Sequence, residues 1–180
     1  VVYTPPYLVH FLVDEVMPLD SPVEDFKILD PSCGSGVFLV AAYQRIIDWW
    51  RIRNKWRKPD SATIKRLLRN SIFGIDISSE AVRLTIFSLS LVLLDASSPK
   101  EIWENLRFDN LKDGGNLFDR DFFELIKEKK LVGTFDLVIG NPPFIEKLTT
   151  PAAIEVETTV ALWDCGYWAL RIPCAFSRSP

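Results

Sequence analysis

Residues 27–39 read KILDPSCGSGVFL, and this stretch decides the fold of the chain. Lys27–Asp30 is a short apolar run bounded by turn residues, which is typical of a buried parallel strand. The glycine turn Pro31–Gly36 follows at once. Val37–Trp50 then carries apolar residues around most of its circumference, as a helix packed against a sheet does. The order strand, glycine turn, helix predicts an α/β fold.

The same order recurs further along the chain. Ser71–Asp76 is predicted to be a second buried strand, and Ser78 can cap a helix over Ala81–Leu94. This repeated alternation predicts a doubly wound, mostly parallel sheet. The other predicted elements are a helix over Pro5–Met17, a weaker third strand within Leu106–Leu117, a helix over Asp121–Lys130 and a strand over Thr134–Gly140.

Two segments depart from this alternation. Arg51–Asn70 carries eight basic side chains and is interrupted by Pro59–Ser61, so we interpret it as an insertion or a helical excursion. Its charges either contact phosphates or form a solvated helical face, and the sequence leaves both open. Pro151–Pro180 shows neither helical nor strand periodicity. We therefore expect residues 149–180 to be an atypical tail, truncated or out of frame.

Composition excludes several classes of protein. The chain is 48% hydrophobic and 25% charged, with mean hydropathy +0.10, which predicts one soluble globular domain or most of one. No apolar run approaches the roughly 20 residues of a membrane span, and no secretory signal is visible, so we expect a cytoplasmic protein without a membrane partner. Three cysteines and one histidine predict no metal site. A net charge of −3 argues against a global positive field that would hold nucleic acid.

The glycine turn is a candidate ligand site. Glycines let the backbone approach a ligand closely, and the following helix offers free amide donors. Phe38 and Leu39 occupy the region where a dinucleotide-binding turn has its third glycine. A nucleoside without a pyrophosphate fits better, and Asp76, at a neighbouring strand end, can accept hydrogen bonds from two ribose hydroxyls. The simpler alternatives are that the glycine turn binds no ligand and that Asp76 is only an acid at the start of the following helix.

The second candidate site, Asn141-Pro142-Pro143-Phe144, follows the strand over Thr134–Gly140 directly. Prolines lack amide hydrogens, so this loop offers carbonyl oxygens and the Asn141 side-chain oxygen as acceptors. Such acceptors suit an amino group, and Phe144 provides a flat surface for a planar ring. An amine on a planar ring suggests a nucleobase, whereas the simpler alternative is an ordinary turn.

Four stretches in order resemble the motifs of the adenine-N6 DNA methyltransferases of restriction-modification systems. They are Tyr3-Thr4-Pro5, Asp30–Leu39, Gly74-Ile75-Asp76 and Asn141–Phe144. The resemblance implies a Rossmann-like fold that depends on S-adenosylmethionine, with a partial catalytic domain over residues 1–148. It also implies a C-terminally truncated fold, since the family continues with further strands and a target-recognition domain.

The resemblance also assigns roles to residues. The segment around Thr4 and the glycine loop would hold the methionine part of the cofactor, and Asp76 its ribose. Asp113 and Asn116-Leu117 are candidates for seating the adenosyl ring. The expected cofactor residues are Tyr3, Thr4, Asp30, Pro31, Gly34, Gly36, Asp76, Ile77 and Asn116, and the expected catalytic residues are Asn141, Pro142, Pro143 and Phe144.

The implied reaction is direct transfer of a methyl group to the amino nitrogen of an adenine flipped out of double-stranded DNA. Expected partners are that DNA and a specificity or restriction subunit, or a fused domain with that role. The alternatives are a protein-glutamine or RNA-base methyltransferase of the same fold, or a non-catalytic fragment that binds cofactor. Cys33 lies in the glycine loop and is not expected to act as a nucleophile, and His10 is expected to pack within its helix.

Overall fold

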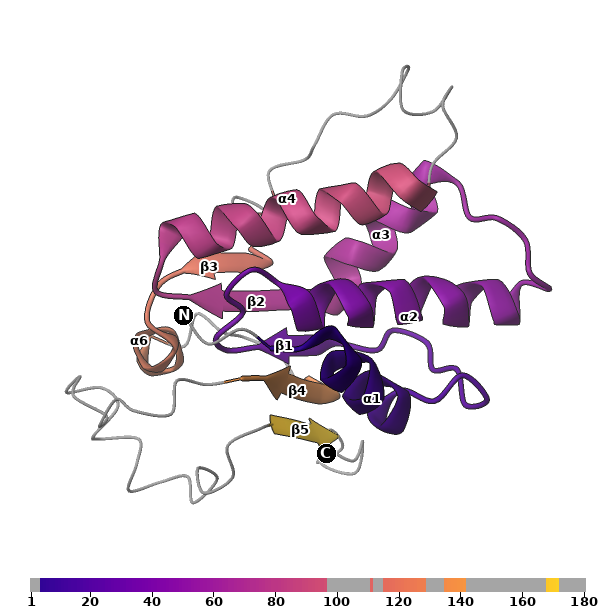
Figure 1. The fold of residues 1–180 in the computed structure, drawn as a ribbon. Coiled ribbons are helices and arrows are strands. Elements are labelled where there is room, and N and C mark those ends of the chain that lie inside the picture. The colour runs from indigo at the N-terminus through magenta and orange to yellow at the C-terminus, as the bar shows by residue number, and fades with distance from the viewer. Residues whose placement is uncertain (1–3, 97–110, 112–114, 129–134, 142–167, 172–180) are drawn as a thin grey trace, which may run out of the picture.

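The computed structural model describes residues 4–96, 111, 115–128, 135–141 and 168–171. Its elements alternate between helix and strand as the sequence predicts (Figure 1). The described helices are α1 (Pro6–Val16), α2 (Val37–Arg53), α3 (Ser61–Ser71), α4 (Ser79–Ala96) and α6 (Phe122–Lys127). The described strands are β1 (Ile28–Asp30), β2 (Ile72–Asp76), β3 (Leu117–Asp119), β4 (Leu137–Gly140) and β5 (Trp168–Arg171).

The strands form one sheet in the order β3-β2-β1-β4-β5. β1, β2, β3 and β4 run parallel to one another, and β5 pairs antiparallel with β4. The chain builds outward from β1 through β2 to β3 and then returns to place β4 on the other side of β1 (Figure 1). β1 and β4 therefore flank a switch point, where the carboxyl ends of parallel strands open into a ligand crevice.

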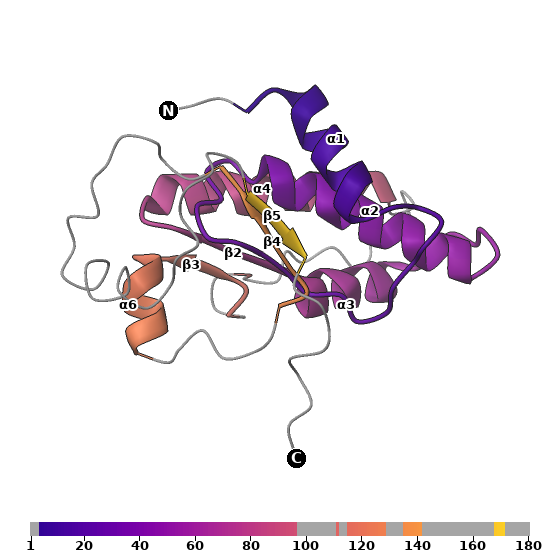
Figure 2. The same cartoon turned by 90° about the horizontal axis from the view of Figure 1, so that it is seen from below.

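Side chains alternate between two hydrophobic layers, one on each face of the sheet. Ile28 and Leu137 point into the larger layer, which also contains the buried faces of α1, α2, α3 and α4. Leu29 and Ile75 point into the smaller layer, where Leu125 of α6 covers them. Figure 2 shows α6 apart from the group of α1, α2 and α4. Helices on both faces confirm the predicted doubly wound α/β sheet.

The basic segment Arg51–Asn70 is a helical excursion, formed by the end of α2, a connection and most of α3. α2 ends at Arg53, and Asp60 then caps α3 by accepting a hydrogen bond at 2.8 Å from the Thr63 backbone N–H. Ile64 is fully buried in the larger layer, and its carbonyl accepts a hydrogen bond from the Tyr43 hydroxyl of α2 at 2.8 Å. α3 is therefore an integral part of the domain.

Two strands differ from what the sequence pattern indicates. The third strand is Leu117–Asp119, pairing Leu117 with Gly74 and Asp119 with Asp76, whereas the sequence predicts it within residues 106–117. The tail shows no strand periodicity, yet Trp168–Arg171 forms β5 and covers the edge of β4. Both strands are too short, at three and four residues, to show an alternation that periodicity can detect. The division at residue 148 stays a prediction.

Within the described ranges, no helix has the length and apolar character to cross a membrane. The same residues contain no group of histidine, cysteine or acidic side chains that could hold a metal ion.

Candidate cofactor and substrate site

The switch point brings Asp30, at the end of β1, against Gly140, at the end of β4. A Cβ atom on Gly140 would lie 2.5 Å from Asp30 Oδ1, so a larger residue at position 140 would displace the Asp30 carboxyl from this position. Asp30 is 1% exposed and accepts a hydrogen bond from the Ser32 backbone N–H at 3.0 Å. Asp30 is thus a buried acid that contacts both the glycine loop and the strand that leads to Asn141.

The glycine loop docks onto the carboxyl end of β2. The Cys33 N–H donates to the Ile75 carbonyl at 2.8 Å, and the Gly34 N–H donates to Asp76 Oδ2 at 2.9 Å. Gly34 and Gly36 both have positive φ, at 53° and 81°, a conformation that strongly favours glycine. A Cβ on Gly34 would meet no atom within 4 Å. The backbone of Gly34 therefore faces open space, as a ligand-binding loop requires.

Asp76 joins this loop to the start of α4. Its Oδ2 accepts from Gly34, and its Oδ1 accepts from the Ser78 backbone N–H at 2.9 Å. Ser78 in turn caps α4 as the sequence predicts, since its hydroxyl accepts from the Ala81 N–H at 3.2 Å. Each carboxylate oxygen has a second lone pair, so the half-buried Asp76 can still accept a hydrogen bond from a ligand hydroxyl. Its role toward ribose stays a prediction.

Burial raises the pKa of two groups at this site. It raises the pKa of Asp30 to about 8, partly offset by the hydrogen bond from Ser32 and reinforced by the charge of Asp76. Burial and the nearby Asp30 also raise the pKa of the Cys33 thiol to about 12. Cys33 is 4% exposed and stays protonated at neutral pH, so it has the properties of a packing residue rather than a nucleophile.

Asn141, the first residue after β4, is held by a segment from the other end of the chain. Its Nδ2 donates to Thr4 Oγ1 at 3.1 Å, and Thr4, just before α1, is 7% exposed. The Oδ1 of Asn141 is buried, and no described residue donates a hydrogen bond to it. A buried acceptor without a donor is costly, and it is satisfied when a ligand brings an N–H or O–H group.

The structure brings most of the described predicted residues to the switch point. They are Thr4, Asp30, Pro31, Gly34, Gly36, Asp76 and Asn141. Ile77 follows Asp76 and is 76% exposed, so it too is available to a ligand on that side. The remaining predicted residues, Tyr3, Pro142, Pro143 and Phe144, lie outside the described residues.

The structure places Asn116, a predicted cofactor residue, apart from the glycine loop, and its role toward the cofactor stays a prediction. Asn116 precedes β3, at the amino edge of the sheet and away from the glycine loop. It is 4% exposed, and its Nδ2 donates to the carbonyls of Arg69 at 2.8 Å and Ile72 at 2.9 Å. Both amide hydrogens are thus used to hold the junction between α3 and β2. Asp113, the other residue considered for this role, lies outside the described residues.

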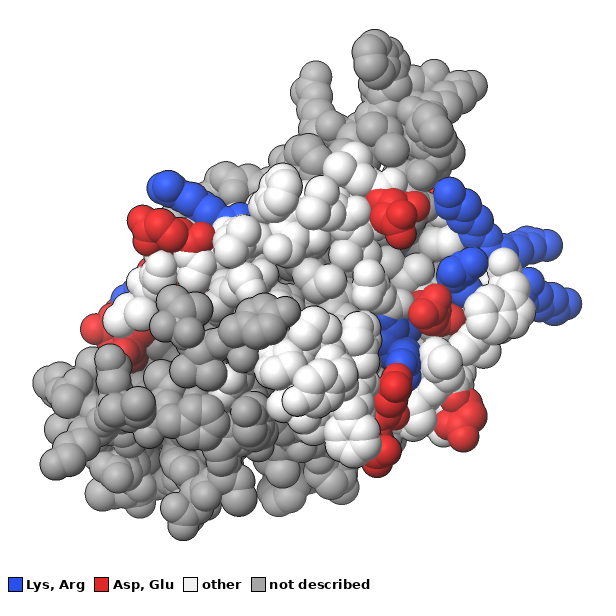
Figure 3. Space-filling view, viewed as in Figure 1, with Lys and Arg blue, Asp and Glu red and all other residues white. Residues whose placement is uncertain are grey.

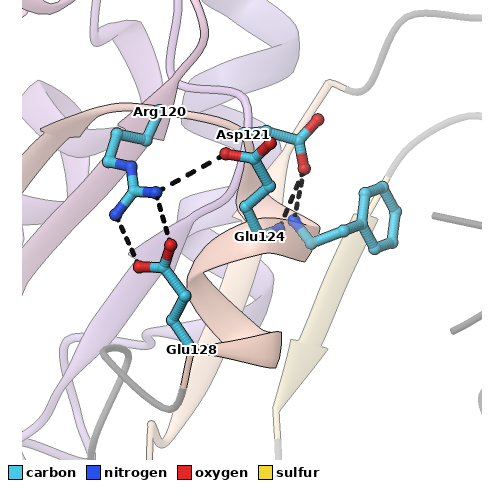
Figure 4. A network of polar contacts seen from close by, with 5 residues as sticks. Arg120, Asp121, Glu124 and Glu128 are labelled. Carbon is cyan, nitrogen blue, oxygen red and sulfur yellow. Dashed lines mark hydrogen bonds and ion pairs between the residues drawn. The ribbon is translucent and has the colours of Figure 1, made fainter. Parts of the chain in front are cut away.

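Asp119 is a further acid at this edge of the sheet, which the sequence analysis did not consider. It ends β3 and lies opposite Asp76 in the sheet, so it reaches the same carboxyl edge as the glycine loop. The next residues serve α6 (Figure 4): Asp121 accepts from the Phe123 N–H at 2.8 Å, and Arg120 pairs with Glu128 at 2.7 Å. The sequence signal for Asp119 is its position directly after the apolar pair Leu117-Phe118. A strand predicted to end at Leu117 leaves Asp119 outside the strand end.

The basic segment lies at the opposite end of the domain. Figure 3 shows basic side chains gathered where α2 and α3 meet. α2 has 17 residues and is therefore about 25 Å long, and it separates this end from the glycine loop. Lys55, Arg57 and Lys58 are exposed there. His10 is also exposed rather than packed. The basic segment does not belong to the switch-point site, whereas His10 lines the same cavity as Thr4 and Ser35.

The chain matches one family model and several known proteins. A family model described as Eco57I restriction-modification methylase matches residues 70–159. The type II methyltransferase M.BstVI of Geobacillus stearothermophilus is 35% identical over 81% of this chain and 24% of its own length. The adenine-specific methyltransferase PglX of Streptomyces coelicolor is 26% identical over 96% of this chain and 17% of its own length.

A solved structure shares the fold. The ATP-dependent type ISP restriction-modification enzyme LlaBIII, bound to DNA, superimposes with a TM-score of 0.54 and 19% identity. The match covers 82% of this chain and 11% of that one. This chain therefore spans about a quarter or less of the length of the proteins it matches.

Proposed function

This chain belongs to the Eco57I restriction-modification methylase family, and from that premise we propose that it is the cofactor-binding and catalytic part of an adenine-N6 DNA methyltransferase. The observation that carries the proposal is the buried Oδ1 of Asn141, to which no residue in the described part of the chain donates a hydrogen bond. The M.BstVI and PglX relatives are named as methyltransferases, and PglX as adenine-specific. These names favour a DNA adenine substrate over a protein glutamine or an RNA base.

The residues around the glycine loop fit S-adenosylmethionine. Asp30 is a buried acid whose pKa is raised, so a cationic amino group placed against it would stabilise its charged form. Gly34 leaves open space above the loop, and Asp76 keeps acceptor capacity for ribose hydroxyls. Asp119 shares the edge of the sheet with Asp76 and is a candidate for the adenosyl ring. The bound cofactor would supply a methyl group activated by its sulfonium.

Asn141 would receive the substrate amine. Its Oδ1 accepts an amino hydrogen, which disfavours delocalisation of the nitrogen lone pair into the ring and orients that pair for attack. Thr4 holds the other end of the amide group, so the oxygen is already oriented before a base arrives. The Pro142 carbonyl as a second acceptor and Phe144 as a stacking surface are part of this proposal. The adenine must leave the duplex to reach such a site.

Double-stranded DNA is the proposed substrate, and a specificity or restriction subunit, or a fused domain, is the proposed partner. The net charge of −3 gives this chain no global attraction for a duplex, so other parts of a longer protein or complex would supply phosphate contacts. A DNA-modifying role also agrees with the cytoplasmic location expected from the sequence.

The test uses the full-length protein that carries this chain. Asn141→Ala should abolish most transfer of labelled methyl groups to unmethylated DNA, while calorimetry shows nearly unchanged affinity for S-adenosylmethionine. Asn70→Ala is the matched control, because Asn70 is exposed on α3, away from the site. Digestion of the product and mass spectrometry should identify N6-methyladenine. Near-normal turnover in Asn141→Ala would show that Asn141 is only a turn residue. Methylation of a different base would contradict the proposal that adenine is the substrate.

A further inference from the structure

Thr85, on the second turn of α4, is fully buried directly behind the glycine loop. Its hydroxyl donates to the Gly34 carbonyl at 2.9 Å, and the same oxygen lies 3.7 Å from the Cys33 sulfur. Its methyl group packs under Gly36, where an added Cβ would lie 2.8 Å from Thr85 Cγ2. One side chain of a distant helix therefore contacts three of the four residues from Cys33 to Gly36.

The contact with the Gly34 carbonyl sets the direction of the next amide. In a trans peptide the carbonyl and the following N–H point to opposite sides. Because Thr85 holds the Gly34 carbonyl toward the core, the Ser35 N–H must point outward. Ser35 is exposed and borders a cavity of about 460 Å³ that Thr4 also lines. No backbone hydrogen bond from the Ser35 N–H occurs among the described residues.

Asp76 holds the preceding peptide, because its Oδ2 accepts from the Gly34 N–H. The Cys33–Gly36 turn is closed by a hydrogen bond from the Gly36 N–H to the Cys33 carbonyl at 2.7 Å, and Gly34 within it has a positive φ. Among the side chains of the described residues, Asp76 fixes the N–H of Gly34 and Thr85 fixes its carbonyl. Of these, Thr85 alone is fully buried and cannot be shared with a ligand.

We infer that Thr85 is a positioning residue of the cofactor site: its hydroxyl holds the Gly34 carbonyl inward and thereby presents the Ser35 N–H as a donor to an anionic or acceptor group of the ligand. This inference rests on the proposed function, since it assumes that the loop binds S-adenosylmethionine. Thr85 touches no ligand itself. It acts through the loop backbone.

The test is calorimetric titration of the full-length protein with S-adenosylmethionine, well below the unfolding temperature of each variant. Thr85→Val keeps the shape and removes the donor, so the dissociation constant should rise about tenfold, the size of one lost hydrogen bond. Thr85→Ser keeps the donor and removes the methyl group, so the affinity should stay near that of the wild type. Loss of affinity in valine together with rescue by serine assigns the effect to the hydroxyl and not to the methyl group that packs under Gly36.

Ser90→Ala is the matched control. Ser90 lies on the same helix, is 7% exposed and donates to the Ile86 carbonyl at 2.7 Å, away from the loop. Ser90→Ala removes a buried hydroxyl of the same helix that does not touch the loop, so it should leave cofactor affinity unchanged. If Thr85→Val does not fold, Thr85→Ala and Thr85→Ser replace it. Both lack the methyl group, so the ratio of their dissociation constants measures the effect of the hydroxyl alone.

The outcomes distinguish a failure of the role inferred for Thr85 from a failure of the proposed function. Wild-type affinity in Thr85→Val, or equal affinities in Thr85→Ala and Thr85→Ser, overturns the positioning role and leaves the proposed function intact. An equal loss of affinity in Ser90→Ala also overturns it, because the effect would then follow stability. A wild-type protein that binds no S-adenosylmethionine overturns the proposed function and the inference together.

Discussion

The Asn141 side-chain amide donates a hydrogen bond to the Thr4 hydroxyl, with 3.1 Å between Nδ2 and Oγ1. The two residues are 137 positions apart in the sequence. Thr4 precedes α1, and Asn141 follows β4, so the contact ties the start of the chain to the candidate catalytic loop. Because Thr4 holds the amide nitrogen of Asn141, the Oδ1 of Asn141 points away from Thr4.

The first prediction concerns this contact. Thr4→Val removes the acceptor and frees the Asn141 amide to rotate, so kcat for methyl transfer should fall about tenfold, the size of one lost hydrogen bond. The KM for S-adenosylmethionine should change little if Thr4 acts mainly through Asn141. Steady-state kinetics of the full-length protein measure both constants. Thr4→Ser retains the hydroxyl and should restore kcat, and failure of that rescue would contradict the positioning of Asn141 by Thr4.

The second prediction concerns stability and pH. The pKa of Asp30 is about 8 in the folded chain and 3.8 as an unperturbed group. Between these values the folded state binds a proton that the unfolded state has lost. The contribution of Asp30 to stability is therefore complete below about pH 4 and is lost progressively as the pH rises toward 8.

Chemical denaturation at several pH values from 5 to 8 measures this effect. The slope from one proton is at most about 1.4 kcal/mol per pH unit. Asp30→Asn should be less dependent on pH across this range, because the amide does not titrate, and the difference between the two curves isolates Asp30. Parallel curves for the variant and the wild type would show that Asp30 is already ionised in the folded chain.

The third prediction links Asp30 to the ligand. If the amino group of S-adenosylmethionine lies against Asp30, binding will lower the raised pKa of that carboxyl and release a proton at pH 7. Calorimetry in buffers with different ionisation enthalpies should therefore give different apparent binding enthalpies. Asp30→Asn should remove most of that difference. A wild-type binding enthalpy independent of the buffer would place the amino group elsewhere.

The central unit of the fold could be predicted because local sequence specifies it. The apolar run that ends in Asp30, the positive φ demanded at Gly34 and Gly36, and the Ser78 cap each depend on residues close in sequence. The order of motifs also placed Asn141 after a strand. From these local features the sequence predicts that most of the described candidate residues lie together at the carboxyl edge of the sheet.

The features that were missed depend on tertiary contacts. β3 and β5 are too short to show a period, and their positions depend on pairing with β2 and β4. Asn116 resembles a loop residue in sequence, but it satisfies two carbonyls of a segment more than 40 positions away. The contact of Thr85 with the glycine loop spans 51 positions and follows from no local pattern.

The last prediction separates Asn116 from the cofactor site. Asn116→Ala removes two hydrogen bonds and leaves the carbonyls of Arg69 and Ile72 without those donors. One intramolecular hydrogen bond contributes about 0.5–1.5 kcal/mol, so the loss of two should lower the free energy of unfolding by roughly 1–3 kcal/mol. Affinity for S-adenosylmethionine should be unchanged, because Asn116 lies at the amino edge of the sheet.

Asp119→Ala provides the contrast, because Asp119 lies beside Asp76 at the carboxyl edge of the sheet. That variant should weaken cofactor binding and lower stability less than Asn116→Ala does. Denaturant unfolding of each variant gives the stability, and calorimetry of the full-length protein gives the affinity. The opposite pattern, with cofactor affinity lost in Asn116→Ala and retained in Asp119→Ala, would restore Asn116 to the site and show that the ligand does not approach the carboxyl end of β3.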